Sequence, residues 1–165
     1  MAFEFTHTRR VEFSDTDMAG IMHFSNFFRF MEVTETAFMR SLGLSVVLSN
    51  CGFDVCLPRV HAECDYQLPL RFEDEVQMRL LVEKKAGRTL TYQFRFMKLN
   101  ANPPVEVARG RLVAVCAAKQ PDGSMKAVPL PQAFADKIQE APEGVLANGA
   151  RPKQNRPATE VLTKS

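Results

Sequence analysis

Apolar residues recur every three or four positions in one long stretch of the chain. This spacing places one polar and four apolar residues on a single face of an α-helix: Phe27, Met31, Thr34, Phe38 and Leu42. Ser25 or Asn26 can cap the start of this helix, because both side chains accept hydrogen bonds from free backbone N–H groups. Gly43 suits the left-handed residue that commonly ends a helix.

Most of the remaining chain alternates between apolar and polar residues with a period of two, which is typical of half-buried β-strands. The segments with this pattern are residues 5–13, 60–66, 76–82, 90–96 and 105–117. Turn-forming residues follow the first segment at 14–20 and separate or end the later ones at 85–88, 100–104 and 121–123. Residues 132–140 are expected to form a brief helix introduced by Pro131.

One strand, one long helix and four further antiparallel strands predict an α+β fold, in which a sheet of about five strands wraps around the helix. We expect one domain at residues 1–140. Residues 141–165 hold few large apolar side chains and are expected to form a flexible tail. The sheet leaves unpaired backbone groups at its edges, so a homodimer or homotetramer is the expected assembly.

Composition and charge argue against several classes of function. Hydrophobic residues make up 45% and charged residues 24% of the chain, as in a globular protein with a core. The net charge is +2, and residues 141–165 hold four basic and two acidic residues, which leaves the body neutral. A neutral body argues against nucleic-acid binding. No apolar run reaches about 18 residues and no signal peptide is evident, so we expect no membrane association and a cytoplasmic location.

The cysteines and histidines do not form a metal-binding pattern. No C-x-x-C pair occurs, and the histidines are scattered, so we expect free, largely buried thiols and no metal. These residues are Cys51, Cys56, Cys64 and Cys116, with His7, His23 and His61.

The turn before the long helix carries the most specific motif. It combines an aromatic-polar-Asp-x-Asp sequence at residues 13–17, a glycine three residues later, and an asparagine that opens the helix. Residues 11–43 resemble the N-terminal signature of the 4-hydroxybenzoyl-CoA thioesterase family within the hotdog superfamily. The later strands and the final helix match in order and length, so the resemblance covers roughly residues 5–138. It implies a hotdog fold and hydrolysis of an acyl-CoA thioester to a free acid and CoA.

The resemblance assigns the catalytic carboxylate to Asp17 and the carbonyl-polarising backbone N–H to Phe24. A helix start presents unpaired N–H groups and a partial positive charge, which stabilise the oxyanion formed when a thioester is attacked. The carboxylate can attack the carbonyl directly or take a proton from water, and both routes stay open. Asp15 is expected to hold the turn.

Other polar residues are weaker candidates for a catalytic role. His23 replaces an aromatic residue of many relatives and could steer a water or contact the substrate; the alternative is a packed or solvent-facing histidine. Glu32 and Glu35 lie on the long helix, where a different hotdog subgroup places its catalytic acid, and we expect them to be solvated. His61 is expected to be structural or exposed.

Substrate binding is assigned to two groups of residues. Gly20 allows close backbone approach to the substrate, and Asn26 stands at the helix start. By the resemblance, the basic turn residues Lys84, Lys85 and Arg88 bind the CoA phosphates, with Arg59 as a further contact; the alternative is a merely solvated turn. CoA arrives as part of the substrate, so we expect no cofactor.

Two alternatives to thioester hydrolysis remain. A hotdog hydratase or dehydratase would use a paired histidine and acid, a role for which His23 is available. A non-catalytic acyl-CoA-binding protein would keep the fold without the chemistry. The acyl group could range from short and medium fatty acyl groups to aromatic ones, because the 13 phenylalanines suit an apolar pocket and an ordinary core equally well.

Overall fold

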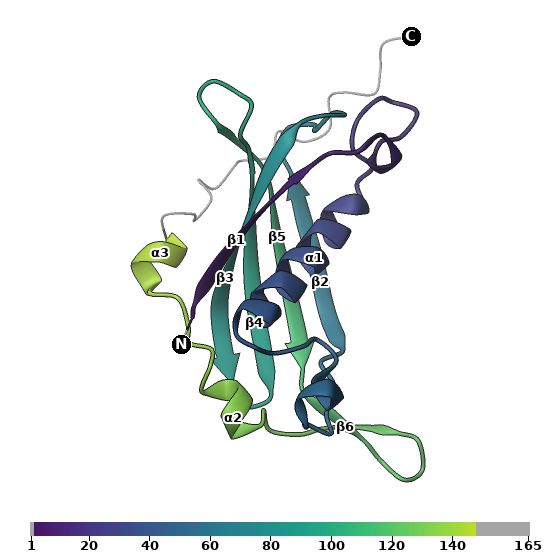
Figure 1. Ribbon diagram of the computed structural model, residues 1–165, viewed down its shortest axis with the longest axis vertical. Coiled ribbons are helices and arrows are strands. Elements are labelled where there is room, and N and C mark those ends of the chain that lie inside the picture. Colours follow the sequence, from purple (N-terminus) through teal and green to yellow (C-terminus); the bar gives the residue numbers. More distant parts are fainter. Residues whose placement is uncertain (1, 148–165) are drawn as a thin grey trace, which may run out of the picture.

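The computed structural model describes residues 2–147 of the 165-residue chain. Five antiparallel strands form one sheet in the order β1-β3-β4-β5-β2, which curves beside one long helix (Figure 1). The strands are β1 (Glu4–Arg10), β2 (Arg59–Tyr66), β3 (Glu75–Ala86), β4 (Thr89–Lys98) and β5 (Val105–Val115). The expected α+β fold with five antiparallel strands and one long helix is confirmed.

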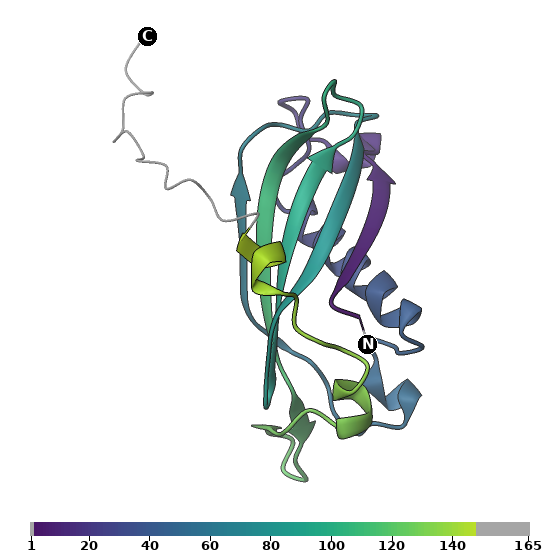
Figure 2. The ribbon, with the colours of Figure 1, turned by 90° about the vertical axis from the view of Figure 1, so that its left-hand side faces the viewer.

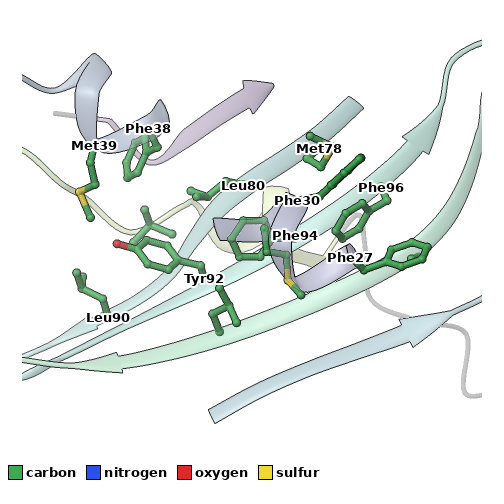
Figure 3. Close-up of a cluster of buried hydrophobic side chains, with 14 of the residues drawn as sticks. Phe27, Phe30, Phe38, Met39, Met78, Leu80, Leu90, Tyr92, Phe94 and Phe96 are labelled. Carbon is green, nitrogen blue, oxygen red and sulfur yellow. The ribbon is translucent and has the colours of Figure 1, made fainter. Parts of the chain in front are cut away.

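Helix α1 (Asn26–Ser41) packs its apolar face on the sheet and ends before Gly43, whose φ of +68° is left-handed. Aromatic rings from both layers meet in the core (Figure 3), and each buries roughly 150–250 Å². The buried rings are Phe27, Phe30 and Phe38 of α1 with Tyr92, Phe94 and Phe96 of β4. Gly110 of β5 brings the sheet close to α1, because a Cβ there would lie 2.2 Å from Met31 Sδ.

The opposite face of the sheet carries helix α3 (Glu143–Ala147), as Figure 2 shows. Arg95 alternates with the buried rings of β4 and donates a 2.9 Å hydrogen bond to the Val145 carbonyl oxygen. The Ala141 N–H donates to the Val82 carbonyl oxygen at 2.8 Å. The expected tail boundary at residue 140 is therefore too early, because polar contacts rather than large apolar side chains hold residues 141–147. Residues 148–165 of that predicted tail lie outside the described residues.

Several predicted boundaries differ from the structure. The first strand ends at Arg10, and a short 3₁₀ turn, η1 (Phe13–Asp15), takes the end of the predicted segment. The last long strand stops at Val115 because the Cys116 N–H turns to the Arg88 carbonyl oxygen. A separate hairpin follows, made of β6 (Ala117–Lys119) and β7 (Met125–Ala127).

The helical turns were also predicted imperfectly. The predicted helix at 132–140 is the single turn α2 (Gln132–Ala135), because Ile138 leaves the helix to pair with Ala2. A second 3₁₀ turn, η2 (Leu48–Cys51), was not predicted.

Strand β2 is more exposed than its alternating pattern suggested. Within the described part of the chain it pairs with β5 alone, and its apolar residues Val60 and Tyr66 are exposed. The expectation of largely buried thiols is wrong for Cys56, which is exposed, whereas Cys116 is buried. Among residues 2–147, none of the helices has the length and apolar content of a membrane span. In the same range no three His, Cys, Asp or Glu side chains gather as metal ligands.

Candidate functional site

A tight turn places Asp17 just before α1. The Asp17 N–H donates to the Ile21 carbonyl oxygen, and the Gly20 N–H donates to the Asp17 carbonyl oxygen, both at 2.9 Å. Gly20 has a φ of +72°, which a residue with a side chain adopts only under strain. The Ala19 N–H donates to Asp17 Oδ1 at 2.8 Å, so the backbone of the turn orients the half-buried carboxylate.

Asp15 and Asn26 fasten this turn to the helix. Asp15 Oδ2 accepts a 2.9 Å hydrogen bond from the Glu12 N–H. The Asp15 carbonyl oxygen accepts from the His23 N–H and from Asn26 Nδ2, both at 2.8 Å. The Asn26 side chain is buried and used inside the protein. Asp15 and Asn26 therefore position the turn. Asn26 was predicted to contact substrate, but its amide donates to the backbone of the turn instead.

Phe24 stands at the entrance to α1 with a free donor. No acceptor for the Phe24 N–H occurs among the hydrogen bonds of residues 2–147. The Phe24 carbonyl oxygen accepts from the Tyr66 hydroxyl at 3.1 Å, which fixes the peptide against β2. The Phe24 side chain is 61% exposed. An unpaired N–H at the positive end of a helix can bind an oxyanion.

Asp17 and Phe24 line the same cavity, which has a volume of about 510 Å³. Its other walls are mostly apolar and come from the helix entrance and the segment after β2: Ile21, Met22, Phe27, Tyr66, Gln67, Leu68, Pro69 and Leu70. Apolar walls strengthen electrostatic interactions inside the cavity because they exclude water. The sequence did not predict that residues 66–70 line the site. Their only sequence signal is the end of a predicted strand followed by Pro69.

The two predicted histidines nearest this part of the sequence do not line the cavity. His23 Nδ1 is 2.8 Å from Ser25 Oγ, and its ring contacts the Phe24 ring at a centroid distance of 4.5 Å. His61 is exposed on β2, where its Nε2 is 3.2 Å from a Glu63 carboxylate oxygen. Neither histidine belongs to the cavity wall.

Glu35 is fully buried, so the expectation that it is solvated is wrong, whereas Glu32 is exposed. Position 35 falls on the same helix stripe as Met31 and Phe38, and the stripe faces the core. Glu35 Oε2 pairs with Arg59, which is therefore engaged here rather than free for CoA. Burial raises the pKa of the Glu35 carboxyl group, and the Arg59 guanidinium opposes this rise.

The predicted phosphate ligands lie far from Asp17 within the subunit. Lys84 and Lys85 lie at the end of β3, and Arg88 lies in the turn between β3 and β4, at the α2 end of the sheet and opposite the start of α1 (Figure 1). The eleven steps of β3, at about 3.3 Å each, separate the two ends by roughly 36 Å. Lys85 Nζ donates to the carbonyl oxygens of Ala135 and Ile138 at 2.7 and 2.6 Å. The structure thus does not bring this basic turn to the cavity.

Comparison with known proteins agrees with this architecture. Residues 11–138 match the thioesterase-like superfamily. A 1,4-dihydroxy-2-naphthoyl-CoA hydrolase of Prochlorococcus marinus is 32% identical over 112 residues, which cover 64% of this chain and 72% of that protein. The crystal structure of a 1,4-dihydroxy-2-naphthoyl-CoA thioesterase from Synechocystis has a TM-score of 0.72 at 26% identity, covering 81% of this chain and 94% of that one.

A more distant structure shows the same fold. The 4-hydroxybenzoyl-CoA thioesterase of Pseudomonas sp. strain CBS-3 has a TM-score of 0.72 at 17% identity, with 82% of this chain and 99% of that chain covered. The suspected family relationship is thereby confirmed together with the hotdog fold. The match over residues 11–138 spans most of the chain, and it includes the Asp17 turn, α1 and all of the sheet except β1. The chain therefore belongs to the thioesterase-like superfamily.

Proposed function

We propose that this protein hydrolyses acyl-CoA thioesters to a free acid and CoA, with Asp17 as the catalytic carboxylate and the Phe24 N–H as the oxyanion donor. The chain is a thioester hydrolase by family, in keeping with the names of its relatives. The observation that carries the assignment of residues is that Asp17 and Phe24 line one apolar cavity. Neither residue alone would distinguish a catalytic site from an ordinary helix entrance.

The cavity supports a simple course of reaction. The thioester carbonyl oxygen accepts a hydrogen bond from the Phe24 N–H, which strengthens as that oxygen gains negative charge. One such donor is worth about 2.7–4 kcal/mol in the transition state. Tyr66 assists indirectly, because its hydroxyl holds the Phe24 carbonyl group and so keeps the adjoining peptide in place.

The Asp17 carboxylate can act by either of two balanced routes. In the first, a carboxylate oxygen bonds to the acyl carbon, the C–S bond breaks, and CoA leaves as the thiolate. Water then hydrolyses the mixed anhydride and restores Asp17. In the second, Asp17 accepts a proton from water while the water oxygen adds to the acyl carbon; the C–S bond then breaks, sulfur takes the proton from Asp17, and CoA leaves as the thiol.

The acyl group proposed for this cavity is aromatic. The walls include Phe27 and Tyr66, whose rings meet edge to face at a centroid distance of 5.0 Å. Aromatic rings favour such edge contacts with further rings. Relatives named as acting on 1,4-dihydroxy-2-naphthoyl-CoA support the same class of substrate.

The test is a screen of the purified protein against aromatic and aliphatic acyl-CoA thioesters, followed by free thiol release. We expect thiol release with the highest kcat/KM on an aromatic thioester. Conversion of an enoyl chromophore without thiol release would support the hydratase alternative. Binding without turnover across the whole panel would contradict the enzymatic proposal.

A further inference from the structure

A buried carboxylate, that of Asp74, holds the anchored turn, residues 71–74, which lies between the wall of the proposed active-site cavity and β3. Asp74 is 5% exposed. Its Oδ2 accepts a 2.7 Å hydrogen bond from the Arg71 N–H. Its Oδ1 pairs with the Lys98 ammonium group at 2.6 Å and accepts from Asn100 Nδ2 at 3.4 Å. Because Lys98 is the last residue of β4, one carboxylate joins the anchored turn to the sheet.

The backbone of the anchored turn is strained. Glu73 has a φ of +68°, a left-handed conformation that a residue with a side chain rarely adopts. The Glu73 N–H donates to the Val11 carbonyl oxygen, and the Val11 N–H donates to the Asp74 carbonyl oxygen, both at 2.9 Å. A strained conformation persists only where its surroundings fix it. The Asp74 carboxylate and these two backbone bonds together keep the turn in this conformation.

The start of the anchored turn contacts both sides of the Asp17 turn. The Leu70 carbonyl oxygen accepts a 2.7 Å hydrogen bond from the Met22 N–H. Arg71 Nη1 lies 3.5 Å from the Gly20 carbonyl oxygen, which is a longer and weaker contact. A shift of the anchored turn would therefore move the Asp17 turn with it.

We propose that Asp74 is a positioning residue of this thioesterase. By fixing the anchored turn, it holds the Asp17 carboxylate where it can reach a thioester whose carbonyl oxygen binds the Phe24 N–H. The inference rests on the proposed function, because Asp74 does not line the cavity and acts through Asp17. A misplacement of about 1 Å can lower an enzymatic rate by about 100-fold, so a remote anchor can matter for catalysis.

Asp74→Asn removes the double anchor with little change in the size of the side chain. The amide has one acceptor oxygen, so it can keep the contact with Arg71 or the contact with Lys98, but not both. We expect kcat on the best acyl-CoA to fall by about tenfold or more. The matched control is Glu75→Gln, which alters the adjacent carboxylate and its surface ion pair with Arg10 and should leave kcat unchanged.

A cycle of double variants separates positioning from general damage. If Asp74 acts by placing the Asp17 carboxylate, Asp74→Asn should not lower kcat further in an Asp17→Asn background, because residues that act as a unit are not additive. Lys98→Gln is a milder second variant should Asp74→Asn fail to fold. It should lower kcat by about three- to fivefold, and this loss should also disappear in the Asp17→Asn background.

Amide hydrogen exchange separates this inference from the proposed function, because it needs no turnover. In Asp74→Asn the amides of residues 17–22 should exchange at least about tenfold faster than in wild type, whereas those of β5 should be unchanged. If exchange rises in this way but wild type hydrolyses no thioester, the positioning of the turn stands and the proposed function fails.

Three results would overturn the inference. The first is wild-type kcat together with wild-type exchange at residues 17–22 in Asp74→Asn. The second is a loss of kcat of the same size with and without the Asp17 carboxylate, which would show that Asp74 supports the fold in general. The third is an equal loss in Glu75→Gln, which would trace the effect to the charge of this region rather than to the anchored turn.

Discussion

At the scale of single residues, the surroundings of a carboxyl group decide what it can do. Asp17 stands in a turn whose backbone donates to one of its oxygens, and it lines an apolar cavity beside a free N–H. Glu35 is a carboxylate of similar chemistry, but it is buried against Arg59, and its Oε1 has no partner within the described chain. The first arrangement leaves a carboxylate available to a substrate, and the second fixes one in the core.

The Glu35–Arg59 pair predicts a pH dependence of stability. Burial raises the pKa of Glu35 above its unfolded value, so the folded state binds the proton more readily. Stability from this group is therefore greatest at low pH and falls as the pH rises through the folded pKa. Arg59→Met removes the guanidinium that opposes this rise. We expect it to destabilise the protein by about 3–5 kcal/mol at pH 8, and by less at pH 5.

Urea denaturation at both pH values measures this effect. The control is Glu35→Gln combined with Arg59→Met, which should recover most of the lost stability and remove the difference between the two pH values. A loss for the single variant that does not change between pH 8 and pH 5 would show that Arg59 acts through packing rather than charge.

The Phe24 backbone donor can be removed without touching Asp17. Phe24→Pro eliminates the N–H, and we expect kcat to fall by about 100- to 1000-fold, because one oxyanion donor is lost. Phe24→Ala keeps the N–H and should retain kcat within about tenfold, although KM rises as the exposed ring is lost. Steady-state kinetics on the best thioester compares the two, with melting temperature as the check on folding. Equal kcat values for the proline and alanine variants would exclude this N–H as the oxyanion donor.

At the scale of elements, the contact between α1 and the sheet depends on Gly110. A Cβ at this position would meet Met31 Sδ and Cε at 2.2 and 2.9 Å, in a core where Met31 is fully buried. Gly110→Ala should therefore cost about 1–3 kcal/mol of stability through overpacking. Gly144→Ala is the matched control, because nothing lies within 4 Å of its added methyl group. Equal urea midpoints for the two variants would show that Met31 moves aside without cost.

The local elements were predictable where the signal lies within one stretch of sequence. Helix α1 was located by its apolar stripe, and its end by Gly43. The resemblance that assigns roles to Asp17 and Phe24 rests on a motif that is contiguous with that helix. The cavity that Asp17 and Phe24 share could not be predicted in the same way, because residues 66–70 reach it from the end of β2. Their approach depends on a long-range hydrogen bond, in which the Met22 N–H donates to the Leu70 carbonyl oxygen.

Long-range pairings account for what the sequence did not predict. The resemblance assigns Lys85 to the CoA phosphates, but its ammonium group donates to carbonyl oxygens 50 and 53 residues away. The burial of Glu35 does have a local signal, because position 35 falls on the apolar stripe of α1.

At the scale of the whole molecule, the two edges of the sheet differ in chemistry. On β1 the exposed side chains are polar, including Thr6 and Thr8. On β2 the apolar Val60 and Tyr66 are exposed, and strand β5 covers only one side of β2. An exposed strand edge with apolar side chains favours pairing with another chain. We therefore propose that two copies associate through β2.

Light scattering tests this assembly. We expect a solution mass of at least twice the 18.6 kDa of one chain. Val60→Glu should shift the mass toward one chain, because like charges would oppose each other across the interface. Thr8→Glu adds the same charge to the other edge and should leave the mass unchanged. A wild-type mass of 18.6 kDa at micromolar concentration would contradict the proposed dimer.

The most direct measurement of the central claim is the rate of thiol release by Asp17→Asn on the best acyl-CoA. The amide keeps the size of the side chain but cannot act as a nucleophile or base, so we predict a fall in kcat of at least about 100-fold with acyl-CoA binding and melting temperature retained. Asp15→Asn alters a turn contact and should lower kcat far less. Near-normal turnover by the Asp17 variant, or an equal loss in both variants, would contradict the assignment of Asp17 as the catalytic carboxylate.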